Sequence, residues 1–241
     1  MHLTSTKLDY SVFKTDSGGI PVIIVAAGSS SRMEGADKQL ITIAGIPVIA
    51  RALMNFERSP LISRIILVTK AEDIFLMQSL CNKYGIKKVS DITPGGDTRH
   101  KSVLCGIAKL GAGEDTVLIH DGARPFLTDG MIADCAAALT RFDGCLCAVP
   151  VSDTVKRANA DESVNKTVDR SDLFLAQTPQ GVKVAKYLSA AESGADYTDD
   201  AAVLESAGYS VKIVAGDKRN IKITTPEDVK IAECMINGGL V

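Results

Sequence analysis

A loop of small, hydroxyl-bearing and basic residues follows the short apolar run of residues 21–25. It reads A-A-G-S-S-S-R-M at residues 26–33, and D-K-Q follows at residues 37–39. Small residues let the backbone come close to a ligand, and the serine N–H groups and hydroxyls suit phosphate oxygens. Two cations lie just beyond them. The pattern predicts a polyphosphate site formed by Ala26, Ala27, Gly28, Ser29, Arg32 and Lys38.

The two best-known phosphate motifs do not account for this loop. The sequence contains neither the P-loop pattern G-x-x-x-x-G-K-[ST] nor the dinucleotide-binding pattern G-x-G-x-x-G at this point. Taken singly, Arg32 or Lys38 is more often a solvated surface cation than a ligand. The combination of small residues, serines and two spaced cations is much more specific than either cation alone.

The apolar run at residues 21–25 lacks alternation, which is typical of a strand buried on both faces of a parallel sheet. Thr225 and Pro226, followed by two acidic residues, predict the start of a last helix. The alternating pattern predicts one doubly wound α/β domain at residues 20–241, with a mostly parallel, Rossmann-like sheet, after an N-terminal extension at residues 1–19. Further strands are expected at residues 65–69, 87–92, 117–120, 145–149 and 211–214, and helices at 47–57, 71–84, 101–110, 131–142, 184–192 and 198–207.

Two more polar motifs follow predicted strands. T-P-G-G-D-T-R occupies residues 93–99, and H-D-G-A-R-P occupies residues 120–125. Ligands of open α/β sheets bind outside the carboxyl ends of the strands. Both motifs are therefore expected beside the loop at residues 26–39, which we call the serine-rich loop. By themselves, Gly95 and Gly96 favour an ordinary turn.

The stretch at residues 153–170 interrupts the alternation of strands and helices. It is polar and charged, with a turn signal at residues 159–162 between β-compatible halves. A long polar excursion in a compact fold is either a disordered insert or a functional arm. Because both halves can form strands, the sequence favours a projecting β-hairpin arm.

The composition excludes several classes of function. The chain has 241 residues, of which 46% are hydrophobic, and a formal net charge of -2, which argues against a general nucleic-acid or anionic-membrane binder. No apolar run approaches the roughly 20 residues of a membrane helix, and residues 1–19 are too polar for a signal peptide, so we expect a cytoplasmic protein. The six cysteines lack zinc-site spacing, so they are expected to be reduced thiols.

The motifs occur in a characteristic order along the chain. After A-A-G-S-S-S-R-M and D-K-Q come G-G-D-T-R-H-K-S, H-D-G-A-R-P, D-T-V-K-R, T-V-D-R, Q-T-P-Q, T-D-D-A and N-I-K-I-T-T-P-E-D. From about residue 21 to residue 236, the chain resembles the 2-C-methyl-D-erythritol 4-phosphate cytidylyltransferases of the non-mevalonate isoprenoid pathway, which are sugar-nucleotidylyltransferase-like enzymes. The resemblance implies a nucleotide-diphospho-sugar transferase fold and transfer of CMP from CTP to a polyol phosphate, with Mg²⁺ or another divalent cation. It also implies a homodimer in which the arm reaches across to complete the partner's active site.

The resemblance assigns roles residue by residue. The implied catalytic cations are Arg32, Lys38, Arg170 and Lys222, and Asp121 is also a candidate ligand of Mg²⁺. Nucleotide-binding positions are Ala26, Ala27, Gly28, Ser29, Gly96, Asp97, Arg99, Ser102 and Gly122. Acceptor-binding positions are Asp121, Arg124, Thr154, Thr178 and Thr198.

Some alternatives stay open at the level of sequence. Ser30 and Ser31 stand where family loops often have glycine or a second basic residue, and Gly122 stands where alanine is frequent. Because a phosphate dianion is already nucleophilic, His100 and His120 are interpreted as structural. A ribitol-5-phosphate cytidylyltransferase shares the CTP site and much of the Q-T-P-Q region, and a molybdenum-cofactor cytidylyltransferase shares A-A-G-x-S-x-R-M. A catalytically silent nucleotide-binding regulator is a third alternative, but such relatives usually lose a catalytic cation, and all four are present here.

Overall fold

The computed structural model describes residues 18–28, 40–192 and 197–241. The N-terminal extension up to residue 17 lies outside the described residues, and so do Ser29, Arg32 and Lys38. The structure therefore describes the residues around the predicted site but not the loop at residues 29–39.

A seven-stranded sheet forms the centre of the fold, in the order β11-β7-β10-β6-β1-β4-β5. Neighbouring pairs are parallel except where β10 runs antiparallel to both β6 and β7. The prediction of a mostly parallel sheet is confirmed. The strands are β1 (Ile20–Val25), β4 (Ile62–Thr69), β5 (Val89–Pro94), β6 (Thr116–Asp121), β7 (Gly144–Pro150), β10 (Phe174–Lys183) and β11 (Val211–Ala215).

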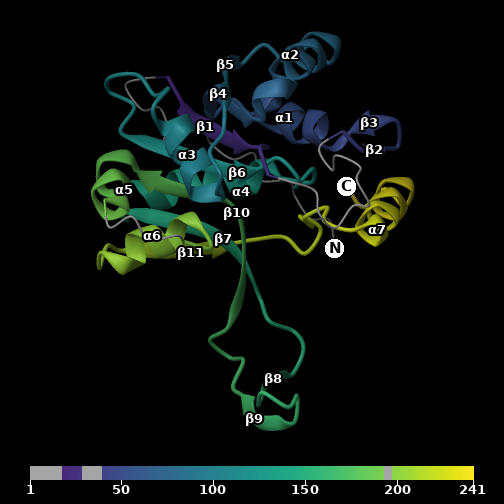
Figure 1. Ribbon diagram of the computed structural model, residues 1–241, viewed down its shortest axis with the longest axis vertical. Coiled ribbons are helices and arrows are strands. Elements are labelled where there is room, and N and C mark those ends of the chain that lie inside the picture. Colours follow the sequence, from purple (N-terminus) through teal and green to yellow (C-terminus); the bar gives the residue numbers. More distant parts are fainter. Residues whose placement is uncertain (1–17, 29–39, 193–196) are drawn as a thin grey trace, which may run out of the picture.

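Helices cover both faces of the sheet (Figure 1). Every residue of β1 is buried: Val22 and Ile24 pack into the core beneath one set of helices, whereas Ile23 and Val25 pack beneath the other. This is the doubly wound arrangement that the uninterrupted apolar run predicts. One set contains α1 (Val48–Arg58), α2 (Ile74–Lys83) and α4 (Asp129–Leu139), and the other contains α3 (Arg99–Ile107), α5 (Val184–Ala191) and α6 (Asp200–Ser206).

The last helix, α7 (Pro226–Asn237), belongs to a smaller apolar cluster with Phe126 and Ile223. It begins as predicted: the Thr225 hydroxyl accepts the N–H of Asp228, and the Asp228 carboxylate accepts the N–H of Thr225. The short hairpin of β2 (Thr42–Ile43) and β3 (Ile46–Pro47) lies against α7 and leads into α1. A 3₁₀ turn at Ala71–Asp73 precedes α2.

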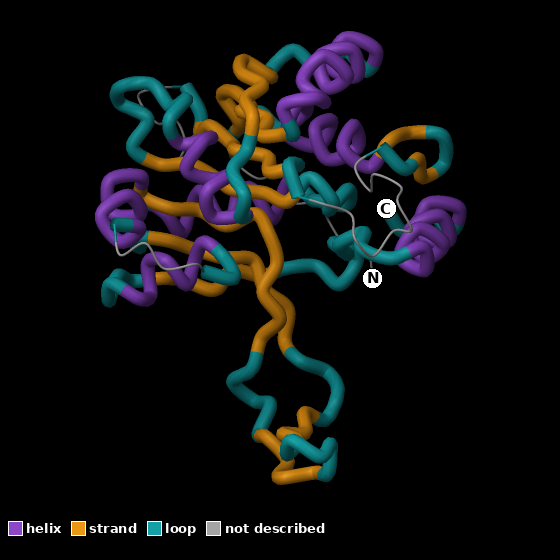
Figure 2. Tube along the Cα trace, viewed as in Figure 1, coloured by secondary structure: helices purple, strands orange, loops and turns teal. Residues whose placement is uncertain are grey.

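The predicted arm is a β-hairpin that projects from the body of the molecule (Figure 2). It consists of β8 (Val155–Ala158) and β9 (Val164–Val168), whose residues are exposed or half-buried. Its stem continues from β7 and returns into β10, where the N–H of Val151 donates to the carbonyl of Leu173. No residue of β8 or β9 is buried in the core of its own chain, so the arm is held only at its root.

No strand is predicted from the sequence at residues 174–183, and the structure corrects this with β10. The proline of Q-T-P-Q cannot donate a ladder hydrogen bond, which argues against a central strand. The structure accommodates it at an irregularity between Ala176 and Gln180, with a cis peptide between Thr178 and Pro179. Helix boundaries also differ slightly, since α3 begins at Arg99 and α6 at Asp200.

No helix in the described parts of the chain is long and apolar enough to cross a membrane. All six cysteines are free thiols, as predicted.

Candidate active site

Two neighbouring pockets open at the carboxyl ends of the parallel strands. We call them the β1 pocket, of about 480 Å³, and the β10 pocket, of about 270 Å³. Arg99, Asp121 and Lys222 line both, so these three side chains form a shared wall. The β1 pocket is completed by Val25, Ala27, Gly28, Gly96, Asp97, Thr98, Ser102 and Ala123, and the β10 pocket by Arg124, Ala176, Gln177, Thr178, Gln180, Thr198 and Asp199.

The β1 pocket depends on a close approach of two loops at Gly95. A Cβ atom on Gly95 would lie 2.5 Å from Cβ of Ala27 and 2.7 Å from Oγ of Ser102, so only glycine fits. The N–H of Gly95 donates to the carbonyl of Thr69 at the end of β4. The glycine pair is therefore more than an ordinary turn, because it brings the loop at residues 95–102 against the end of β1.

Side chains within this loop hold its backbone in place. The hydroxyl of Ser102 donates to the carbonyl of Thr98 at 2.9 Å and accepts the N–H of Gly96 at 3.2 Å. Thr98 caps α3 by accepting the N–H of Lys101. The Asp97 side chain is 82% exposed, and a hydrogen bond from Lys101 lowers its pKa. The pocket wall at this point thus consists mainly of backbone and a small hydroxyl.

Asp121, the last residue of β6, is surrounded by three cations. Its Oδ1 lies 3.0 Å from Nε of Arg99, and its Oδ2 lies 2.8 Å from Nζ of Lys222 and 3.9 Å from Nε of Arg124. Burial by itself would raise the pKa of Asp121, but the charges of Arg99 and Lys222 hold it well below its usual range. The carboxylate is therefore ionised and organises a positively charged wall that suits phosphate groups.

His120 connects this wall to β10. Because the carbonyl of Arg124 can only accept, Nε2 of His120 carries the proton and donates to it at 3.1 Å. Nδ1 then accepts from the hydroxyl of Thr178 at 3.0 Å, and that hydroxyl accepts the N–H of Asp121 at 3.1 Å. Burial lowers the pKa of His120 to about 4. His120 is thus a neutral side chain that ties the Asp121 loop to β10.

The loop that carries Lys222 is held by two side-chain amides. The amide of Gln177 pairs with the backbone of Asp217, with its Nε2 donating at 2.9 Å and its Oε1 accepting at 3.2 Å. Nδ2 of Asn220 donates to the carbonyl of Thr178 at 2.8 Å, and Nη1 of Arg124 donates to the carbonyl of Asn220 at 2.7 Å. These contacts place Lys222 beside Asp121 although the segment has no regular secondary structure.

The structure brings most of the predicted residues together. Ala27, Gly28, Gly96, Asp97, Arg99 and Ser102 line the β1 pocket, and Arg124, Thr178 and Thr198 line the β10 pocket. Ala26 is buried beside them and donates its N–H to Val68. Gly122, like Ala26, is not among the described residues that line either pocket, and its N–H donates to the carbonyl of Val25.

Thr154 and Arg170 are not brought to these pockets within the described chain. Both are exposed at the root of the arm, where Arg170 donates to the carbonyl of Ser152. Sequence reasoning also missed residues that the structure places at the site, above all the buried carboxylate of Asp200, together with Gln177, Gln180 and Asn220. All four lie in motifs of the sequence: Asp200 in T-D-D-A, Gln177 and Gln180 in Q-T-P-Q, and Asn220 in N-I-K-I-T-T-P-E-D.

A divalent cation has one suitable ligand on the shared wall. Among the described residues, no group of three or more His, Cys, Asp or Glu side chains is arranged to hold a metal ion unaided. Mg²⁺ rarely needs such a cage, because it usually takes one or two carboxylates and completes its shell with substrate phosphates and water. The Asp121 carboxylate, which lines both pockets, fits that donor set.

Comparison with known proteins agrees with this geometry. A relative from Geobacter metallireducens, a 2-C-methyl-D-erythritol 4-phosphate cytidylyltransferase, is 43% identical over 224 residues, covering 89% of this chain and 96% of the relative. The enzyme of the same name from Geobacillus kaustophilus is 42% identical over 219 residues, covering 89% of this chain and 95% of that enzyme. The crystal structure of 4-diphosphocytidyl-2C-methyl-D-erythritol synthase from Anaerococcus prevotii superposes with a TM-score of 0.81 at 29% identity, covering 92% of this chain and 97% of that one.

The family model described as 2-C-methyl-D-erythritol 4-phosphate cytidylyltransferase matches residues 20–238, which include both pockets, the arm and α7. The match therefore extends over every element that builds the site. On this match and the similarity to the two bacterial relatives, the chain belongs to the 2-C-methyl-D-erythritol 4-phosphate cytidylyltransferase family.

Proposed function

We propose that this chain transfers CMP from CTP to 2-C-methyl-D-erythritol 4-phosphate, releasing pyrophosphate, in the non-mevalonate route to isoprenoid precursors. The observation that carries the proposal is the shared wall of Arg99, Asp121 and Lys222 between two pockets. A group-transfer enzyme must hold both reactants with the reacting atoms next to each other, and adjoining pockets with a common charged wall provide this.

CTP would occupy the β1 pocket and the acceptor the β10 pocket. Gly96, Asp97 and Ser102 would surround the cytosine, where backbone groups and a small hydroxyl can recognise an exocyclic amine. Arg124, Thr178 and Thr198 would contact the polyol phosphate, with Lys222 between the two substrates. The serine-rich loop with Arg32 and Lys38 would hold the triphosphate.

The reaction needs positioning and charge compensation more than proton transfer. A phosphate oxygen of the acceptor attacks the α-phosphorus of CTP, a new P–O bond forms, and the bond from that phosphorus to the bridging oxygen breaks to release pyrophosphate. Both reacting groups are anions. Lys222 and Arg99, on the shared wall, and Lys38 and Arg32, in the serine-rich loop, would offset the charge that develops on the phosphate oxygens.

Mg²⁺ is the proposed cofactor, and Asp121 with phosphate oxygens of CTP would hold it. When bound, the ion supplies further charge neutralisation on the triphosphate. Arg99 would keep the Asp121 carboxylate in place through the 3.0 Å hydrogen bond from its Nε.

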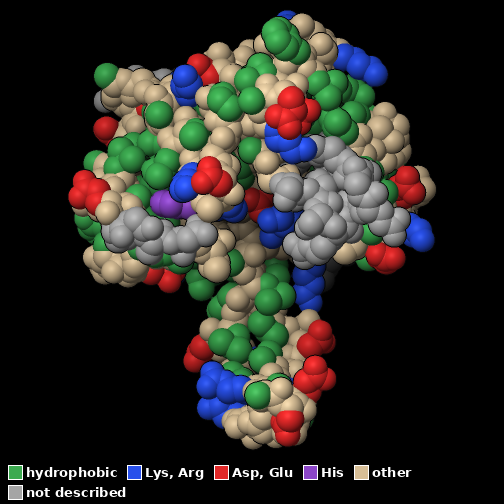
Figure 3. Space-filling model, in the orientation of Figure 1, with side chains coloured by type: hydrophobic (Ala, Val, Ile, Leu, Met, Phe, Trp, Pro, Cys, Tyr) green, Lys and Arg blue, Asp and Glu red, His purple; other side chains and the backbone are tan. Residues whose placement is uncertain are grey.

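A homodimer with shared sites is the proposed assembly. The arm exposes apolar side chains at its tip and root, since Val164 is 63%, Leu175 58% and Phe174 43% exposed. Figure 3 shows hydrophobic side chains gathered along the stem of the arm. A second copy of this chain would cover them, and Thr154 and Arg170 at the root of the arm would then reach the partner's β10 pocket.

The test is an assay of pyrophosphate release from CTP with 2-C-methyl-D-erythritol 4-phosphate or ribitol 5-phosphate as the acceptor. We expect turnover with the first and at least about a hundredfold lower kcat/KM with the second, because a site built for one acceptor leaves polar groups unpaired with the other. A preference for ribitol 5-phosphate would overturn the proposed acceptor. Release that needs no acceptor would overturn the transfer reaction itself.

A further inference from the structure

We propose that Asp200 is a positioning residue that fixes the guanidinium of Arg99 on the wall between the two pockets. Asp200 is the first residue of α6 and is only 1% exposed. Its Oδ2 accepts a hydrogen bond from Nη2 of Arg99 at 2.7 Å, while Nε of Arg99 donates to Asp121 at 3.0 Å. The inference rests on the proposed function, because it assigns a role in the same site.

The guanidinium of Arg99 is therefore held by two carboxylates from different elements, α6 and β6. Burial by itself would lower the pKa of Arg99, but the charges of Asp200 and then Asp121 raise it. Nε and Nη2 each donate to a carboxylate, and Nη1 makes no hydrogen bond to another described residue, so Nη1 is able to donate to a ligand. A planar guanidinium held through two of its nitrogens has a fixed direction for the third.

Asp200 is itself held from two sides. Its Oδ1 accepts from the hydroxyl of Tyr187 in α5 at 3.1 Å, and Nδ1 of His100 lies 3.1 Å from the same hydroxyl. Because the Tyr187 proton goes to Asp200, His100 is the donor in the second contact. Burial, followed by the charge of Asp200, raises the pKa of Tyr187, so the hydroxyl keeps the proton that it donates.

The backbone at Asp200 is also fixed. Oε1 of Gln180 in β10 accepts the N–H groups of both Asp200 and Ala201 at 2.9 Å, and Asp199 caps α6 by accepting the N–H of Ala202. The first turn of α6 is thereby tied to the strand that carries Thr178. Both oxygens of the buried Asp200 carboxylate and its backbone N–H are hydrogen-bonded, so Asp200 is itself fixed and can orient the Arg99 side chain toward substrate.

Asp200 affects catalysis only through Arg99. Asp200→Asn removes the charge at nearly constant volume, and we expect kcat/KM to fall about 10- to 100-fold because the guanidinium is no longer held. In an Arg99→Ala background, Asp200→Asn should change kcat/KM by less than about twofold. The experiment is a double-mutant cycle of these two substitutions, with pyrophosphate release as the readout.

The melting temperature gives a second readout of the same cycle, because Asp200→Asn should raise the Tm when it is added to Arg99→Ala. Arg99→Ala leaves a buried carboxylate without its cation, so its Tm should be lower than that of the wild type. Adding Asp200→Asn to Arg99→Ala removes that charge and should raise the Tm again. A merely structural Asp200 would instead lower the Tm in both backgrounds.

Two further variants keep the proposal testable if Asp200→Asn does not fold. Tyr187→Phe removes one of the hydrogen bonds that hold Asp200 but leaves its charge and Arg99, so kcat/KM should fall, by less than in Asp200→Asn. Arg99→Lys keeps the charge of Arg99 but has no fork to join two carboxylates, so kcat/KM should fall about tenfold or more. Wild-type turnover by Arg99→Lys would overturn the proposal.

Equal losses from Asp200→Asn in the Arg99 and Arg99→Ala backgrounds would also overturn it, as would wild-type turnover by Asp200→Asn. Wild-type turnover of CTP and the acceptor is measured first, because its absence contradicts the proposed function and leaves this inference standing. In that case the Kd for CTP is measured by calorimetry for the wild type, both single variants and the double variant. Asp200→Asn should weaken CTP binding when Arg99 is present and should change it little in the Arg99→Ala background.

Discussion

Nζ of Lys222 lies 2.8 Å from Oδ2 of Asp121, and both side chains line the two pockets. This contact places a cation where the triphosphate and the acceptor phosphate would meet. The carboxylate also receives Arg99, so Lys222 can turn toward a phosphate without leaving Asp121 unpaired.

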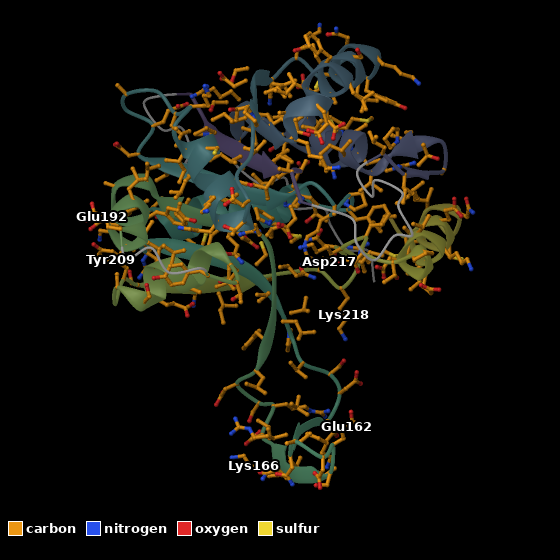
Figure 4. All side chains as sticks on the ribbon, in the orientation of Figure 1. Glu162, Lys166, Glu192, Tyr209, Asp217 and Lys218 are labelled. Atoms are coloured by element: carbon orange, nitrogen blue, oxygen red, sulfur yellow. The ribbon has the colours of Figure 1, made fainter. Side chains whose placement is uncertain are left out.

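We predict that Lys222→Ala loses about a hundredfold or more in kcat/KM, because one cation facing transition-state charge contributes about 3 kcal/mol. The KM for the acceptor should rise more than the KM for CTP. The matched control is Lys218→Ala, since Lys218 is an exposed lysine of the same loop that points away toward the arm (Figure 4). Steady-state kinetics on both variants check the prediction, and equal losses from the two would contradict it.

We predict that CTP is preferred over UTP by about a hundredfold or more in kcat/KM. The base would face backbone groups at residues 96–98 and the hydroxyl of Ser102, which cannot all be paired with the wrong base. Competition assays with the two nucleotides measure the preference. Comparable use of UTP would show that this loop does not recognise the base.

Asp97→Ala is the companion variant for base recognition. Its side chain is exposed and pairs with Lys101, so the substitution should leave the Tm within about 1 °C of wild type. We expect Asp97→Ala to narrow the CTP preference, and an unchanged preference would assign recognition to the backbone and Ser102.

We predict that stability falls as the pH is lowered from about 6.5 toward 4, with His120 as one cause. The unfolded chain takes up a proton at the ordinary pKa of 6.5, whereas the folded chain does so only at about 4. The difference amounts to at most about 3 kcal/mol of unfolding free energy. Asp121, whose folded pKa is depressed, loses its contribution to stability mainly below its unfolded pKa of 3.8, so the two windows meet near pH 4.

The measurement is the free energy of unfolding by urea at several pH values between 4 and 7. His120→Gln keeps a donor and an acceptor but does not titrate, so its stability should depend less on pH in this window. An identical slope for the variant and the wild type would assign the pH dependence to other groups.

We predict that the active site is shared between two subunits. Arg170 lies at the root of the arm and does not line the described pockets of its own chain, whereas the serine-rich loop with Lys38 follows its own β1. Lys38→Ala and Arg170→Ala should each be inactive alone. Mixed under subunit exchange, about half of the dimers should be mixed and should carry one intact site, so about a quarter of all sites should recover.

Differential tags verify that mixed dimers form. Activity that stays at the level of the separate variants, with mixed dimers present, would show that Arg170 serves its own subunit.

The class of the sheet, the arm and most of the pocket residues can be predicted from the amino-acid sequence. Uninterrupted apolar runs such as β1 predict buried parallel strands, and the motifs follow those strands because ligands bind at their carboxyl ends. The hairpin was predictable because its turn and strand signals are local in the chain. The helix start at Thr225 was predictable for the same reason.

How these residues contact one another depends on the folding of distant parts of the chain against each other. β10 was missed because a proline argues against a strand, and the pairing that overrides it comes from β6 and β7, which lie far away in the sequence. Asp200 gains its position from partners about 100 and 13 residues away, Arg99 and Tyr187, which no local pattern reveals. Burial and charge partners set the ionisation of Asp121 and His120, and both depend on three-dimensional neighbours, because the electrostatic energy of a group is fixed by distance and solvent exposure and not by its place in the chain.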